Sequence, residues 1–263
     1  MSPTTIPGKM ILRNQPSAWA EGGDTVYDIE ISGTVYRVHM FTTVGTSELV
    51  VVLGGEMEYL VVAGGGSGGG GRSVPNGGGG GAGGLSTGFT TLGVQSYLIT
   101  VGSGGASVAR DVDGNNGGNS AMGVLVTATG GGGGASTTAS SGGSGGGRSS
   151  ATGSGGTGIP GQGFDGGDCL TSTGTYGAAG GGGAGGEGAD ADNTTSTGQP
   201  GGPGVVSSIT GANVTYAAGG DGGTANVAGA DAVNSTGNGG TGGGATSSGG
   251  AGGSGIVIVR YAI

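Results

Sequence analysis

The feature that most constrains this chain is an apolar, strand-like run that passes directly into glycine. Residues 59–71 read Tyr-Leu-Val-Val-Ala and then seven glycines interrupted by one serine. Weaker transitions of the same kind occur at Val124–Gly134, Tyr176–Gly188 and Tyr216–Gly223. Only seven of the 78 glycines precede residue 64. A domain boundary is therefore predicted near residue 63, and the fold of the rest depends on what glycine tracts can build.

The first 63 residues divide into two predicted parts. Residues 1–22 hold three of the seven prolines and the only tryptophan, Trp19, and are predicted to form an extended arm. Trp19 either packs on its own domain or docks the arm onto a carrier protein, and both alternatives stay open. Residues 23–63 are predicted to form a small antiparallel β base with strands at 26–32, 35–42, 48–53 and 57–63, the first two marked by period-two alternation. His39, on the polar face of the second strand, is predicted to lie at the surface.

Residues 64–263 alternate between glycine tracts and short apolar islands. A Gly/Ser-rich chain is by default a flexible linker. Apolar islands at 97–101, 122–128, 205–209, 214–217 and 256–263 argue against a linker, because such segments are rarely left in water. The alternative is a bundle of polyglycine II helices, which have three residues per turn and bond only to neighbouring helices. The sequence thus predicts a mostly β protein with a polyglycine II bundle over 64–263 and no α-helix.

The tracts also suggest a direction for each part of the bundle. A helix surrounded by others must be pure glycine, so 77–81, 130–134 and 180–183 are predicted to lie in the interior. Tracts that follow an apolar island are predicted to leave the base, and the last strand, 256–263, is predicted to pair with 57–63. The connectors 72–76, 136–141, 189–200 and 224–238 are then distal. The direction of the tract 249–255 is not fixed by this argument.

Catalytic and cofactor chemistry find little support in the sequence. There is one histidine and one cysteine, and Cys169 is interpreted as a small buried apolar residue. Gly153, Gly155 and Gly158 match dinucleotide-loop spacing by chance, because no helix signal follows. Oxygen-rich stretches at 111–115 and 185–190 lack the complete ligand pattern of a calcium loop or β-roll. We expect no enzyme, metal or cofactor, and the net charge of −9 argues against nucleic acid as a partner.

The motif Glu-Tyr-Leu-Val-Val-Ala-Gly-Gly-Gly at 58–66, the many glycine tracts and the closing Gly-Gly-Ser-Gly-Ile-Val-Ile-Val-Arg-Tyr at 252–261 resemble the glycine-rich domain proteins of tailed phages. The resemblance covers residues 56–263. The predicted bundle is similar in architecture to that of tail-fibre tip adhesins, which have a polyglycine II core.

The resemblance implies a tip protein of a phage tail fibre or other virion appendage that displays variable polar loops to a host receptor, either a surface polysaccharide or an outer-membrane protein. Its expected location is the virion or the extracellular space, reached without a signal peptide. Trp19 is the candidate for attachment to the fibre shaft or another carrier. The alternative is a self-assembling filament subunit, and the oligomeric state stays open. An ice-binding bundle is disfavoured, because the tracts lack strict three-residue periodicity. The candidate receptor-binding residues of the distal loops are Arg72, Asn76, Asp190, Asp192, Asn193, Asn226, Asp231 and Asn234.

Overall fold

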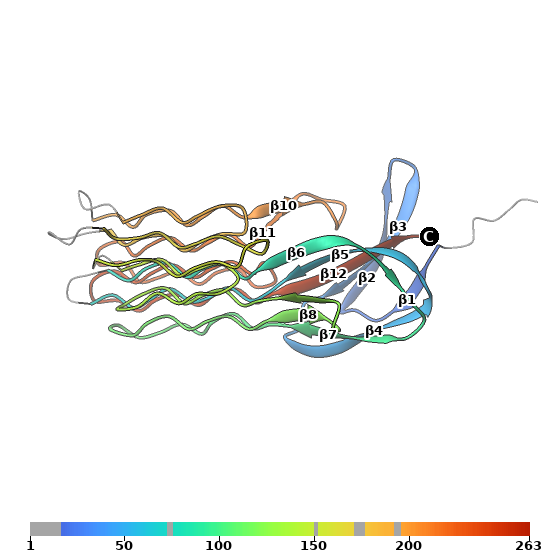
Figure 1. Cartoon of the computed structure of the whole chain (residues 1–263), viewed down its shortest axis with the longest axis horizontal. Coiled ribbons are helices and arrows are strands. Elements are labelled where there is room, and N and C mark those ends of the chain that lie inside the picture. The colour runs from blue at the N-terminus through green and yellow to red at the C-terminus, as the bar shows by residue number, and fades with distance from the viewer. Residues whose placement is uncertain (1–16, 73–75, 150–151, 171–176, 192–195) are drawn as a thin grey trace, which may run out of the picture.

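The structure is a computed structural model that describes residues 17–72, 76–149, 152–170, 177–191 and 196–263. A β base lies at one end, and a glycine-rich bundle extends from it along the long axis (Figure 1). The described residues contain strands and irregular structure but no α-helix. The strands are β1 (Trp19–Glu21), β2 (Thr25–Ile31), β3 (Thr34–Phe41), β4 (Gly45–Leu53), β5 (Gly55–Val62), β6 (Leu85–Leu92), β7 (Ser96–Val101), β8 (Ser120–Met122), β9 (Val126–Ala128), β10 (Val205–Ser207), β11 (Val214–Tyr216) and β12 (Ile256–Ala262).

Two five-stranded antiparallel sheets form the base. One has the order β1-β4-β7-β8-β9 and the other the order β2-β3-β12-β5-β6. The prediction that the last strand pairs with the fourth is confirmed, since Ile256 lies opposite Val62 and Arg260 opposite Glu58. The last strand therefore joins both ends of the glycine-rich region to one sheet.

The apolar residues of the base form two clusters on opposite faces of the second sheet. Between the two sheets lie Phe41, Met57 and Val259 of one sheet against Leu49 and Ile99 of the other, with their buried neighbours. The opposite face, around Leu60 and Ile258, is covered by the β10–β11 hairpin through Ile209 and Tyr216. The second sheet is thus covered on both sides over the half that lies nearest the bundle.

His39 shows the consequence of this two-sided packing. The prediction that it lies at the surface is wrong: its side chain is only 1% exposed. His39 faces the other sheet, where its Nδ1 lies 2.7 Å from the Gly22 carbonyl oxygen and its Nε2 lies 3.0 Å from the Tyr261 hydroxyl. Burial lowers its pKa, and the charge of Arg37 lowers it further, against the opposing effect of the Gly22 hydrogen bond.

The first glycine tract, residues 64–71, shows how the bundle is held together. Its amides at 64, 67 and 70 donate to one neighbouring segment, at Gly118, Asn115 and Val112. The amides at 65, 68 and 71 donate to a second segment at Gly253, Gly250 and Ser247, and those at 66 and 69 to a third at Gly81 and Gly78. Every third amide thus points to the same neighbour. This is the period expected of an extended helix with three residues per turn, the geometry of polyglycine II.

Close approach of the backbones explains why these positions are glycine. A Cβ built on Gly68 would lie 2.0 Å from the carbonyl oxygen of Thr241, and one on Gly132 would lie 1.9 Å from that of Ser140. Such contacts with backbone atoms cannot be relieved by rotating a side chain. The pure-glycine runs 77–81, 130–134 and 180–183, predicted to be interior, are all buried.

The tracts run back and forth between the base and the far end (Figure 1). As predicted, the tracts that follow β5, β9 and β11 leave the base. The tract 180–188 was predicted to do so as well, and this is wrong for its first residues, 180–183. Gly79 and Ala82, on a tract that returns to β6, donate to Ala179 and Gly182 in the same order, so both tracts run towards the base. The tract 249–255 also returns to the base, because it leads directly into β12.

Candidate functional site

The far end of the bundle brings together turns that are distant in sequence. The Gly71 amide donates to Ser247, the Asp111 amide to Gly71, and the Ala225 amide to Ser196. These contacts join segments up to 176 residues apart, between Gly71 and Ser247. The distal end is therefore a composite surface built on a hydrogen-bonded scaffold.

Arginine is concentrated at this end of the molecule. Arg72 and Arg110 both approach Asp111, with Nε–carboxylate distances of 3.6 and 3.0 Å, and each arginine side chain is nearly half exposed. A third, Arg148, ends another outgoing tract and donates to the carbonyl oxygens of Thr137 and Thr152. Two arginines thus share one aspartate, which leaves a local excess of positive charge on an acidic protein.

Many of the Asp and Asn side chains have a structural role in the bundle. Asn116 and Asn119 accept hydrogen bonds from the amides of Gly133 and Gly130 at 2.9 Å. Asp113, three residues earlier, accepts from the amides of residues 136, 137 and 138. Burial opposes ionisation of Asp113, but these hydrogen bonds outweigh it and its pKa is lowered. At every third residue from 113 to 119, a side-chain oxygen thus accepts the hydrogen bond of a neighbouring amide in place of a backbone carbonyl oxygen.

Some of the predicted receptor-binding residues are exposed at the distal end, and others are buried or bonded within the bundle. Arg72 is exposed at the distal end, and Asn226 is exposed in the distal turn with a φ of 62°. Asn76 is only 4% exposed and begins the return tract, so it offers little surface. Asp190 is exposed, and its Oδ1 accepts the amide of Asp168 at 2.8 Å.

The two predicted residues Asp231 and Asn234 face the neighbouring tract. Asp231 accepts the amide of Ala251 at 2.7 Å, and Asn234 accepts that of Ser254 at 3.2 Å. Ser254 lies two residues before β12, so Asn234 is at the base end of the bundle and not in a distal loop as predicted. The chain turns back towards the base after 224–227, which the sequence did not reveal. Asp192 and Asn193 lie outside the described residues.

A shallow hollow of about 170 Å³ lies near the distal turn. It is lined by residues of three neighbouring segments, among them Asp221, Thr224, Val227 and Thr241. Oδ1 of Asp221 accepts the Gly201 amide and the Thr224 hydroxyl oxygen accepts that of Gly198, so both side chains are held in place. The hollow is small, and the apolar residues Val227, Ala228 and Ala230 of its lining are exposed.

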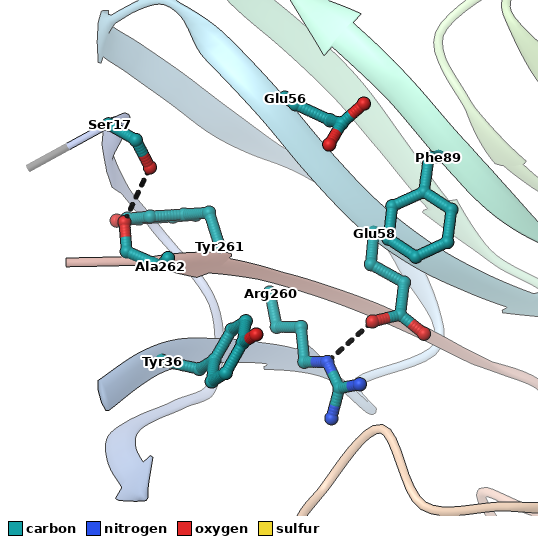
Figure 2. Close-up of a pocket in the computed structure, with 8 residues that line it drawn as sticks. All are labelled: Ser17, Tyr36, Glu56, Glu58, Phe89, Arg260, Tyr261 and Ala262. Carbon is teal, nitrogen blue, oxygen red and sulfur yellow. Dashed lines mark hydrogen bonds and ion pairs between the residues drawn. The ribbon is translucent and has the colours of Figure 1, made fainter. Parts of the chain in front are cut away.

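A larger hollow of about 250 Å³ lies on the base (Figure 2). Arg260 and Glu58, from β12 and β5, form an ion pair at 2.6 Å on its floor. Tyr36 of β3 lies beside Arg260, whose Cζ is 5.2 Å from the tyrosine ring centre, and Phe89 of β6 lies beside Glu58. Glu56 is exposed at the rim. Sequence reasoning missed this site, because its residues meet only through the register of four strands.

Trp19 is not part of an extended arm. It belongs to β1, which pairs with β4, and the Arg37 guanidinium lies 4.4 Å from its ring centre. The structure therefore supports the alternative in which Trp19, which is partly buried, packs on its own domain. The prediction of an extended arm is wrong for residues 19–21, and residues 1–16 lie outside the described part.

Other chemistry in the described residues is sparse. They contain no group of three or more His, Cys, Asp or Glu side chains placed to hold a metal ion. Cys169 is buried, as predicted. In the part of the chain that the structure describes, no helix is long and apolar enough to span a bilayer.

Comparison with protein families identifies the domain. The model of the family described as "Glycine-rich domain" matches residues 42–262. The chain belongs to the glycine-rich domain family. The match starts within the base, at the end of β3, and includes β12, so the glycine-rich domain comprises most of both sheets as well as the bundle. A search of curated proteins found no match.

Proposed function

We propose that this glycine-rich domain protein is the tip protein of a phage tail fibre or similar virion appendage, and that its distal end binds a bacterial surface receptor. The observation that supports this most is the arrangement of the distal end. Turns from distant parts of the chain meet there, on a scaffold whose successive amides bond to three neighbours. Loops held by a rigid scaffold are a frequent basis for recognition, because their sequence can vary without loss of the fold.

The charge of the distal end favours an anionic receptor. Arg72 and Arg110 share Asp111, so together they retain one uncompensated positive charge in exposed positions. Arginine binds carboxylate and phosphate through paired N–H groups. Acidic surface polysaccharide, with such groups and many hydroxyls, matches both the arginines and the polar turns. We therefore propose it as the receptor class, in preference to an outer-membrane protein.

Purified protein applied to an array of acidic and neutral bacterial polysaccharides tests this proposal. Binding to an acidic member is expected, and R72A/R110A is expected to weaken it at least about tenfold, as the loss of one charge-assisted contact would do. The matched variant R72K/R110K retains the charge and should retain part of the binding. Equal binding by the wild type and R72A/R110A would contradict the role of the distal arginines.

A filament subunit is the second candidate, and one observation favours it. β2 and β6 are edge strands of the same sheet, and open edges are able to pair with other chains. Electron microscopy of the purified protein distinguishes the two functions. Elongated polymers would support the filament, and monodisperse particles that bind polysaccharide would support the tip protein.

A further inference from the structure

The hollow on the base, at the opposite end from the distal turns, has no role in the function proposed above. Along β3, β12, β5 and β6, the second sheet carries Tyr36, Arg260, Glu58 and Phe89 on the face that the β10–β11 hairpin covers closer to the bundle. Arg260 donates to the carbonyl oxygens of Ser208 and Ile209 in that hairpin. The hairpin ends there, which leaves the outer part of the sheet face open.

The charged groups of the hollow differ in how many hydrogen bonds and ion pairs they form. Arg260 is occupied by Glu58, the Tyr36 ring and two carbonyl oxygens, and its side chain is only 13% exposed. Glu56, by contrast, has an exposed carboxylate that forms no hydrogen bond or ion pair with the described residues. Beside it, Phe89 is 68% exposed. One unpaired carboxylate next to one open aromatic ring is an arrangement that suits a cationic side chain.

The edge of the sheet adjoins this hollow. β6 pairs with β5 on one side, and its residues 86–92 form no backbone hydrogen bond with any other described segment. Thr87, Phe89 and Thr91 are exposed along it. An extended segment that paired with this edge would lie two strand spacings, about 10 Å, from β5. A side chain of this segment on the same face as Phe89 would pass over the Phe89 ring towards Glu56. The distance to be bridged is within the combined length of an arginine and a glutamate side chain.

We propose that β6 and the hollow form a docking site for an extended segment of a partner protein, which adds a strand to β6 and places an arginine or lysine over Phe89 against Glu56. Main-chain pairing would supply affinity and the hollow would select the side chain, as in other cases of strand addition. A second copy of this chain is a poorer occupant, because the chain carries a net charge of −9.

The test uses the full-length ¹⁵N-labelled protein and a probe peptide, acetyl-Thr-Val-Arg-Val-Thr-Val-amide, followed by NMR titration. The peptide is expected to shift the amides of residues 87–91 and to slow hydrogen exchange at those that face outwards. Replacing the arginine of the peptide by glutamine, or Glu56 by glutamine in the protein, should each weaken binding at least about tenfold. F89A should weaken it as well, whereas E48Q, an exposed glutamate on the other sheet, should leave it unchanged.

Two results would overturn the proposal. Absence of shifts at residues 87–91 at millimolar peptide would exclude strand addition, and equal affinity for the arginine and glutamine peptides would exclude the hollow as a cation site. A peptide with N-methylated amides separates the two contributions, because it retains the charge but cannot pair with β6. It should bind more weakly than the parent peptide. None of these outcomes depends on whether the distal end binds polysaccharide.

Discussion

The substitution Gly68→Ala adds a single methyl group in the first tract, and its effect follows from the distances in the bundle. The new Cβ would lie 2.0 Å from the Thr241 oxygen and 2.3 Å from its carbon. Ordinary contact starts near 3.4 Å, so the two backbones must separate by about 1.4 Å. Hydrogen bonds between Gly240 and Gly66 and between Gly243 and Gly69, each 2.9 Å long, span the same gap and would be broken.

The magnitude can be estimated from these two bonds. A buried backbone group without a partner costs about 1–3 kcal/mol, so the loss is about 2–6 kcal/mol. Replacement of glycine by alanine restricts the unfolded chain and returns only about 0.4–1 kcal/mol. The clash therefore dominates, and Gly68→Ala should lower the free energy of unfolding by several kcal/mol, a large share of the usual 5–15 kcal/mol.

Chemical denaturation followed by circular dichroism measures this change. The matched control is Gly93→Ala in the turn between β6 and β7, where a Cβ would meet nothing closer than the Tyr97 hydroxyl oxygen at 4.0 Å. We expect the control to be neutral or slightly stabilised. If Gly68→Ala were as stable as Gly93→Ala, the tract would not be packed against its neighbours and the reasoning would be refuted.

Two further predictions concern polar groups. Folding lowers the pKa of His39 from 6.5, so the unfolded chain binds more protons and the free energy of unfolding should fall as the pH drops below about 6.5. His39→Asn should remove this component of the pH dependence, which thermal unfolding between pH 7 and 5 measures. If the melting temperature of His39→Asn depended on pH as that of the wild type does, His39 would not be its source. Asn116→Ala removes the acceptor of the Gly133 amide and should lower the free energy of unfolding, measured with denaturant, by about 1 kcal/mol. Asn116→Asp retains an acceptor oxygen and should lower it less. Equal decreases for the two variants would show that the acceptor oxygen is not the cause.

Local patterns in the sequence predicted much of the fold. Alternation located β2 and β3, and the apolar islands located most of the strands that interrupt the glycine-rich region. Pure glycine predicted burial, because only a residue without Cβ allows such close backbones. These signals are local consequences of strand geometry and sterics, which is why they were readable without the structure.

Apart from the pairing of the last strand with 57–63, features that depend on the partner of a segment were not readable. The alternation in β3 predicts an exposed polar face, but a second sheet covers that face and buries His39. β6, with Thr, Ser and Gly at most positions, lacked an apolar pattern and was not predicted as a strand. The hollow around Arg260 required the register of four strands. One signal was present and overlooked: the three-residue spacing of Asp113, Asn116 and Asn119 matches the helix period and indicates oxygens that face one neighbouring tract.

The central claim is that the glycine tracts form an ordered, mutually hydrogen-bonded bundle, and amide hydrogen exchange measured by NMR tests it most directly. Each amide from residue 64 to 71 donates to another segment at 2.8–3.0 Å. The account predicts that these amides exchange as slowly as those of β5 and β12. Exchange of the tract at random-coil rates, with β5 and β12 still protected, would contradict it.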